Sequence, residues 1–181
     1  IESMTGEILK GFKMTNGVQT TTMADIDLAG VQSAPEASTF FNLGANLNAA
    51  ATAASTFSSP ITLYSSVGST VTLNLAFTKV SGANKWTFAA TPSLGSITAG
   101  ASGSVSFDTN GQLTKVNDAA AADHSFTLDF SSADPPANEM ALNWDLVDSL
   151  GATHGKLTGF AAASNNNAMI QDGFTTGTLL G

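Results

Sequence analysis

The sequence predicts an all-β fold, specifically an antiparallel β-sandwich or an irregular barrel. Short segments in which apolar and polar residues alternate recur along the chain, and this is the pattern of strands that bury one face. Gly, Asn, Asp and Pro separate these segments, as expected for tight turns between antiparallel strands. Helical periodicity is scarce. Seven or more strands of this kind favour a sandwich or barrel over a single open sheet.

The clearest predicted strand covers residues 70–79. Val71, Leu73, Leu75 and Phe77 lie on one of its faces, and Thr and Asn lie on the other. Such alternation predicts a sheet with one buried and one solvated face.

A strand at 61–64 and a turn at 66–68 precede that segment, so the two strands are expected to form a hairpin. Further alternating segments follow at 85–90, 104–107, 113–116, 124–132 and 140–149. The sequence DTNG at 108–111 predicts a tight turn, because Asp and Asn before Gly favour left-handed backbone conformations. The residues expected to make the core rigid are Phe77, Trp86, Phe107, Phe126, Phe130 and Trp144.

The remaining segments are less regular. Apolar residues are thinly spread over the first 55 or so positions, which predicts an extended lead-in. The Ala-rich stretch 49–54 is interpreted as a linker, with one or two helical turns as the alternative. Residues 95–103, GSITAGASG, are expected to form a flexible surface loop.

Composition limits the possible functions. The 181-residue chain carries a formal charge of −8, has six Lys and no Arg, and has only 11% charged residues. Without a basic surface, nucleic acid is an improbable partner. There is no cysteine, which excludes disulfides, thiolate zinc sites and a thiol nucleophile. No apolar run approaches the ~18 residues that a membrane helix needs.

Residues that could perform chemistry are few. His124 and His154 lack the spacing of a zinc motif and are expected on turns or polar strand faces. Asp25 with Asp27, and Asp145 with Asp148, resemble the carboxylate pairs of glycosidases only weakly, because turns also use Asp. The sequence therefore predicts no catalytic, cofactor-binding or metal-binding residue.

Two further patterns have a structural and a functional interpretation. Asp108, Asn110 and Gln112 share the spacing of a calcium loop, but Gly111 comes one place early and no Glu closes the loop, so a hairpin is favoured. Trp86, Trp144 and Tyr64 could form a sugar-stacking platform. At alternating strand positions, however, such residues are more often core.

Several motifs in order resemble the flagellar hook proteins and, more broadly, the axial proteins of the flagellar rod and hook. They are ITLYSSVGSTVTLNLAFTK at 61–79, NKW at 84–86, FDTNGQL at 107–113, LDFS at 128–131 and QDGFTTGTL at 171–179. Upstream, ILKGFKMTNGV and FFNLGANLNAAA match further pieces of the same pattern. Two departures from the pattern occur: Ser65 and Ser66 stand where Asp-Ser is usual, and Phe174 replaces Tyr.

The resemblance implies a domain organisation. Residues 1–37 would belong to an inner β domain and lead-in, 38–176 would form the outer β domain, and 177–181 would return to the inner domain. The heptad-bearing terminal helices of these proteins are not found in this sequence, so it resembles the middle of a longer subunit.

The resemblance also implies a function without catalysis. The chain would be a structural subunit of the hook, the flexible curved tube that transmits motor torque to the filament. Its expected partners are copies of itself and other flagellar axial and junction proteins, with no nucleic acid, membrane, cofactor or small-molecule substrate. It would be extracellular and exported without a cleavable secretory signal. Loops at 92–103, 117–123 and 133–139 are expected to contact neighbouring subunits.

Three alternatives stay open at this point. The chain could belong to the distal rod, which shares most of the motifs. It could be a secreted β-sandwich adhesin or carbohydrate-binding module, which would need an exposed aromatic pair. It could also be an enzyme that uses the Asp pairs, in which case replacing Asp145 or Asp148 would abolish its activity.

Overall fold

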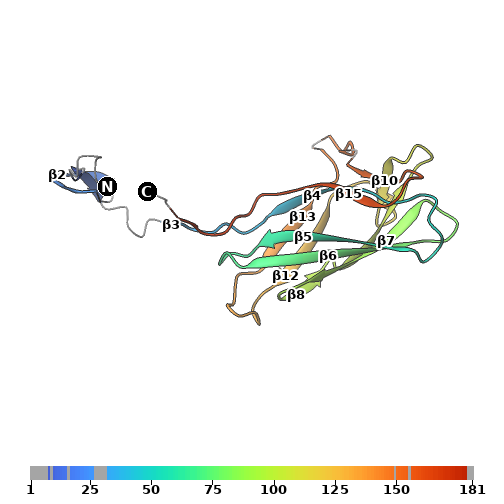
Figure 1. Cartoon of the computed structure of the whole chain (residues 1–181), viewed down its shortest axis with the longest axis horizontal. Helices are drawn as coiled ribbons and strands as arrows, with labels where there is room; N and C mark the ends of the chain where they lie inside the picture. Colours follow the sequence, from blue (N-terminus) through green and yellow to red (C-terminus); the bar gives the residue numbers. More distant parts are fainter. Residues whose placement is uncertain are drawn as a thin grey trace. The chain divides into compact units, whose positions relative to one another are not determined.

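The computed structural model describes residues 8, 10–15, 17–26, 32–148, 150–154 and 156–178, and all regular elements in them are strands. The chain divides into two compact units (Figure 1). The larger unit is Pro35–Thr175, and the smaller unit combines Ile1–Ala34 with Thr176–Gly181. No helix in the described part of the chain has the length and apolar character to cross a membrane.

One sheet of the larger unit has six strands and is antiparallel throughout, in the order β11-β10-β9-β7-β6-β5. Its strands are β5 (Thr56–Tyr64), β6 (Thr70–Lys79), β7 (Lys85–Pro92), β9 (Ser102–Phe107), β10 (Leu113–Val116) and β11 (Ala119–Ala120). β5 and β6 pair without interruption from Thr56↔Thr78 to Tyr64↔Thr70. This long ladder confirms the predicted hairpin.

The second sheet also has six strands, in the order β14-β4-β13-β12-β8, with β15 paired to β4. Its strands are β4 (Phe40–Asn46), β8 (Ser96–Ala99), β12 (His124–Asp129), β13 (Met140–Trp144), β14 (Leu157–Thr158) and β15 (Asn165–Gln171). β4 runs parallel to β13 and β14 and antiparallel to β15. The sheet is therefore mixed, whereas the sequence predicted antiparallel pairing.

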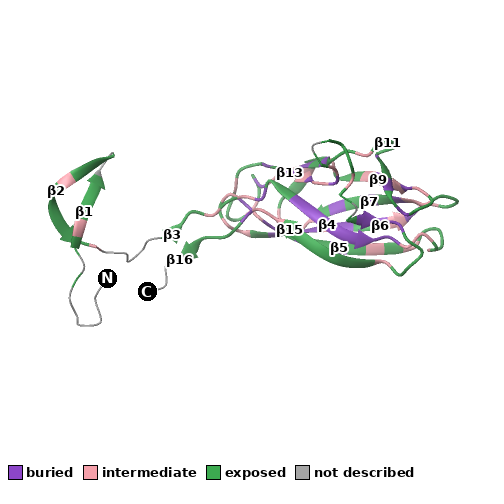
Figure 2. Ribbon diagram, turned by 90° about the horizontal axis from the view of Figure 1, so that it is seen from above, coloured by how far each residue is buried: buried purple, intermediate pink, exposed green. Residues whose placement is uncertain are grey.

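Aromatic side chains join the two sheets face to face. Trp144 stacks on Phe41 of its own sheet, with ring centroids 5.9 Å apart, and meets Phe77 and Phe88 of the other sheet edge-on at 6.2 and 5.3 Å. Phe88 also lies 6.4 Å from Phe126 across the sheets. The buried residues form one layer between the sheets (Figure 2). The predicted core aromatics Phe77, Trp86, Phe107, Phe126, Phe130 and Trp144 are all buried.

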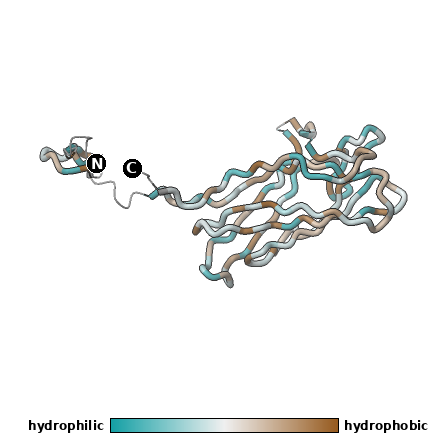
Figure 3. Tube along the Cα trace, in the orientation of Figure 1, coloured by the Kyte–Doolittle hydropathy of each residue, from teal (hydrophilic) through white to brown (hydrophobic). Residues whose placement is uncertain are grey.

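The alternation read from the sequence is visible along the strands (Figure 3). In β6, Val71, Leu73, Leu75 and Phe77 are fully buried while the intervening positions are not. The strands predicted at 85–90, 124–132 and 140–149 are confirmed. β7 extends the first by two residues, and β12 and β13 lie inside the other two. The turn at 108–111 is also confirmed, and Gly111 adopts a positive φ of 74° there.

Two local predictions were wrong. Residues 95–103 are not a free loop, because they contain β8, which pairs with β12. The first 55 residues are not merely a lead-in, because β4 within them is a central, buried strand. Its Ala, Gly and Asn side chains give it little apolar alternation. Residues 49–54 form turns that connect β4 to β5, in agreement with the linker interpretation and not with helical turns.

The smaller unit has two short sheets. β1 (Lys10–Thr15) and β2 (Val18–Asp25) form a hairpin around Gly17, which has a φ of 78°. β3 (Gln32–Ser33) pairs antiparallel with β16 (Gly177–Thr178), so segments from the two ends of the chain meet in this unit.

Candidate functional site

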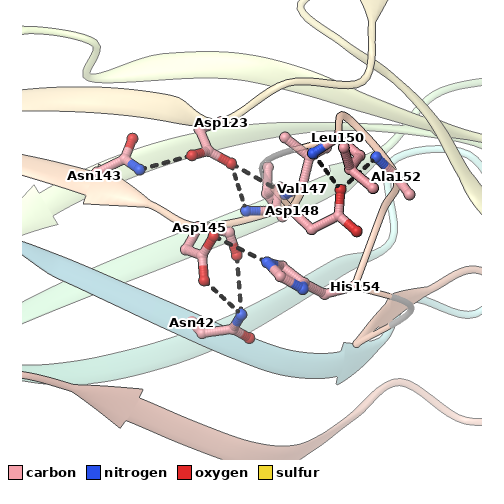
Figure 4. A network of polar contacts seen from close by, with 10 residues as sticks. Asn42, Asp123, Asn143, Asp145, Val147, Asp148, Leu150, Ala152 and His154 are labelled. Carbon is pink, nitrogen blue, oxygen red and sulfur yellow. Dashed lines mark hydrogen bonds and ion pairs between the residues drawn. The ribbon is translucent and has the colours of Figure 1, made fainter.

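Asp123 is the centre of a polar network beside the end of β13 (Figure 4). Its carboxylate accepts hydrogen bonds from Asn143 Nδ2 at 2.8 Å and from the amides of Leu146 and Val147 at 2.9 and 3.0 Å. These bonds attach the segment after β13 to the turn before β12. The carboxylate thus has a structural role.

The environment of Asp123 makes stability depend on pH. Burial raises its pKa, but the hydrogen bonds and the nearby His154 outweigh this effect, so the pKa lies below its ordinary value of 3.8. A lowered folded-state pKa gives stability that is present above the unfolded pKa and is lost as pH falls through the folded value.

We expect Asp123→Asn to reduce the free energy of unfolding by about 1 kcal/mol at neutral pH, because charge-assisted hydrogen bonds are lost at a solvated site. This difference should shrink as the pH falls below 3.8. Urea unfolding of both proteins at pH 7 and in acid measures it, with Glu139→Gln on an exposed loop as the control. A difference that stays constant with pH would contradict the assignment.

Asp145 and Asp148 accept hydrogen bonds from different partners. Asp145 Oδ1 accepts a bond from His154 Nε2 at 3.0 Å, and its Oδ2 accepts one from Asn42 Nδ2 at 3.3 Å. Asp148 Oδ1 instead accepts the amides of Leu150 and Ala152, both at 2.9 Å. The hollow between Asp145 and His154 is too tight for a water molecule. Both carboxylates therefore stabilise the 145–154 segment.

The other carboxylate patterns are also structural. Asp25 forms an ion pair with Lys10 at 3.7 Å across the β1–β2 hairpin, while Asp27 lies outside the described residues. Asp108 Oδ1 accepts the amides of Asn110 and Gln112 at 2.9 and 2.8 Å, which is turn geometry and supports the hairpin interpretation. Among the described residues, no cluster of three His, Asp or Glu side chains could hold a metal ion.

His124 is not on a polar face as predicted, since it is only 8% exposed. Its ring lies edge-on to Phe88 and Phe126, at 5.0 and 4.7 Å. Asn117 Nδ2 donates a hydrogen bond to His124 Nδ1 at 3.1 Å. His124 Nε2 donates one to the Gly100 carbonyl at 2.9 Å. His124 alternates in phase with Phe126 and Leu128, and this periodicity could have placed it inside.

The tryptophans are core residues, as the strand positions favoured. Trp86 and Trp144 are 1% and 0% exposed, and Tyr64 is half-buried. These three side chains therefore form no exposed stacking platform for sugars.

A second polar cluster lies where the chain enters and leaves the larger unit. It joins Ser38 and Thr39, just before β4, to Gln171, Asp172 and Gly173, at the end of β15, and we call these five residues the clasp. Asp172 Oδ1 accepts the amides of Thr39 and Phe40 at 2.8 and 3.2 Å, and its Oδ2 accepts the Thr39 hydroxyl.

Gln171 and Ser38 complete the clasp. The Ser38 hydroxyl donates to Gln171 Oε1 at 2.8 Å and accepts the Tyr64 amide at 3.0 Å, which connects β5 to the cluster. Gln171 Oε1 also accepts the Gly173 amide at 2.6 Å, and its Nε2 donates to the Gly173 carbonyl at 3.0 Å. The clasp thus ties three strands together.

Steric crowding explains why position 173 of the clasp is a glycine. A Cβ on Gly173 would lie 2.5 Å from Ser38 Oγ and 2.6 Å from the Ser38 nitrogen, closer than real Cβ contacts. Beyond the clasp, Glu36 and Phe174 exchange two backbone hydrogen bonds, of 3.0 and 2.9 Å. Burial raises the pKa of Asp172, but bonds from Thr39 and Phe40 outweigh it and lower the pKa below 3.8.

The sequence indicated only half of the clasp. The motif at 171–179 includes Gln171, Asp172 and Gly173, but it indicated no role for them. No sequence pattern marked Ser38 or Thr39. Ser and Thr are abundant throughout the chain, so nothing local marks these two residues as its partners across more than 130 positions.

The fold and the clasp define a β-sandwich domain that the chain enters and leaves along two paired segments. The family model of the flagellar basal body protein FlaE D2 domain matches residues 35–174. The chain belongs to this family, which confirms the resemblance that the ordered motifs indicated.

A solved structure supports the fold. A 32 kDa fragment of the flagellar hook protein FlgE from Caulobacter crescentus superposes with a TM-score of 0.52 at 20% sequence identity. The match covers 64% of this chain and 46% of that fragment, so the chain spans about half of the fragment's length. No curated protein sequence matches the chain.

Proposed function

We propose that the chain is part of a structural subunit of the bacterial flagellar hook, the curved tube that transmits torque from motor to filament. The observation that carries this proposal is the family match over residues 35–174. The likeness in fold to a hook protein fragment supports it. In this role the subunit acts through its shape and its contacts with copies of itself and other axial proteins, and it catalyses no reaction.

The surface of the first sheet suits repeated packing. Many outward positions on β5, β6 and β7 carry small or short polar side chains, namely Thr56, Ser58, Thr62, Thr70, Thr87, Ala89 and Thr91. Such side chains lose little rotamer entropy when contacts form and leave no charge unpaired. Contacts between such surfaces can slide, as a bending tube requires.

We further propose the domain organisation 1–37, 38–176 and 177–181, with an inner and an outer β domain. The compact units at 1–34 with 176–181 and at 35–175 support a division near these positions. The loops at 92–103, 117–123 and 133–139 remain the proposed contacts with neighbours, although β8 orders the first and β11 lies in the second.

The second candidate is an axial protein of the distal rod. The family description itself refers to the flagellar basal body, which favours a location nearer the cell envelope. Rod and hook subunits would use this domain in the same way, as a covering of an axial tube, so only the location separates the two proposals.

Electron microscopy with antibody raised against residues 35–175 tests the location. We expect label on the short curved segment between cell body and filament of the source cells. Label restricted to isolated basal bodies would establish the rod instead. Label over the general cell surface would overturn both proposals in favour of an adhesin. Pre-immune serum on the same cells is the control.

A further inference from the structure

We propose that the clasp of Ser38, Thr39, Gln171, Asp172 and Gly173 is the mechanical joint through which force passes into the larger unit, with Asp172 as its principal positioning residue. This inference rests on the proposed structural function and adds a specific route for the load. It follows from where the chain crosses between units and from which bonds lie first on that path.

The chain passes between the two units twice, at Ala34–Pro35 and at Thr175–Thr176. Inside the larger unit these two segments run side by side, because Glu36 and Phe174 form an antiparallel bridge. β4 and β15 continue the same pair from Phe41↔Gln171 to Asn46↔Asn165 (Figure 1). Any force that separates the two segments must therefore open this ladder from its end.

Opening from the end is the weak direction of a β-ladder. The hydrogen bonds are loaded one after another rather than together, so resistance depends on the first few interactions. Here the backbone provides two bonds at the Glu36–Phe174 bridge. The clasp comes next, before the main β4–β15 ladder, and it concentrates side-chain bonds at this position.

Asp172 contributes most to this resistance. Its three donors, the amides of Thr39 and Phe40 and the Thr39 hydroxyl, all belong to the opposite segment. Bonds to a carboxylate are stronger than those between neutral groups. Ser38, which is 1% exposed, extends the attachment to the Tyr64 backbone. Load is thereby passed to both sheets, since β5 belongs to the sheet opposite β4.

Single-molecule pulling from two different pairs of handles tests the joint. The chain has no cysteine, so introduced cysteines provide unique attachment points. Ala34→Cys with Thr176→Cys loads the larger unit through its two connecting segments. Ala53→Cys with Asn110→Cys loads two exposed turns that take no part in the clasp. Asp172→Asn keeps the side-chain shape and removes the charge.

Under constant force through residues 34 and 176, we expect Asp172→Asn to speed unfolding by on the order of 10- to 100-fold. Through residues 53 and 110 the change should stay below about threefold, because the clasp is not opened first on that path. Ser38→Ala should show a smaller effect with the same directional dependence. Asp129→Asn is the matched control, since Asp129 accepts two bonds only from nearby Ser131.

An equal effect of Asp172→Asn from both pairs of handles would overturn the proposal, because Asp172 would then support only general stability. No effect through residues 34 and 176 would overturn it as well. The result does not depend on where the protein lies in the cell. Antibody label on the hook without a directional effect would refute the joint and leave the proposed function intact.

Discussion

Trp144→Ala is expected to lower the free energy of unfolding of the larger unit by about 4 kcal/mol, the usual range for removing a buried indole. Trp144 is fully buried and contacts Phe41 in its own sheet and Phe77 and Phe88 in the other. Its loss opens a cavity at the centre of the layer between the sheets. Since domains of this size are stable by about 5–15 kcal/mol in total, this variant should be close to unfolding.

Trp144→Phe is the informative comparison. It keeps an aromatic ring in the stack and removes the indole Nε1–H, which is buried without a hydrogen-bond partner. We therefore expect a smaller loss, about 1–2 kcal/mol. Urea unfolding followed by circular dichroism measures both variants without relying on the removed fluorophore. A cost of Trp144→Ala below about 1.5 kcal/mol would mean that the sheets do not depend on this contact.

The sequence predicted those parts of the fold whose information is local. In β6 from Val71 to Phe77, and in β12 at Phe126 and Leu128, every second residue is apolar, so burial can be read directly from the spacing. The turn at 108–111 is equally local, because Asp108 bonds to amides two and four residues away. These elements were predicted correctly without knowledge of their partners.

The missed elements depend on partners that are distant in the sequence. β15 reads NNNAMIQ and is exposed along nearly its whole length, so no burial pattern marks it as a strand. It exists because β4 offers it a free edge. β4 itself is buried through small and polar residues such as Gly44 and Asn46. The side-chain amide of Asn46 bonds to the backbone of Phe160 and Ala162, more than 110 residues away.

The same reasoning explains the candidate site. Asp145 and Asp148 are close in sequence, yet they bind different partners. Asp145 accepts bonds from His154 and Asn42, and Asp148 accepts the amides of its own turn. Asp172 and Thr39 are far apart in sequence, yet the Asp172 carboxylate accepts three bonds from Thr39 and Phe40. This contact lies where the chain enters and leaves the larger unit. Spacing along the chain could not indicate the pairing of Asp172 with Thr39, because the clasp is created by the topology.

Gly100→Ala is expected to cost about 3 kcal/mol, from two effects that add at one residue. Gly100 has a φ of 77°, a region that L-residues adopt at a cost of about 1–2 kcal/mol. A Cβ there would also lie 2.1 Å from the carbonyl oxygen of Ser125 on β12. The turn between β8 and β9 would have to move, and the bond from His124 to the Gly100 carbonyl would be strained.

Gly82→Ala separates the two effects. Gly82 has a φ of 71°, but a Cβ there meets no atom within 4 Å. It should therefore show the backbone cost alone, about 1 kcal/mol. Urea midpoints of the two variants at equal m-values measure the difference. If both variants lost the same stability, the β8–β9 turn could move away from β12 at no cost in free energy, and β8 would be a weakly held edge strand. A larger loss for Gly100→Ala shows instead that contact between β12 and this turn holds β8 in the sheet, where the sequence predicted a free loop.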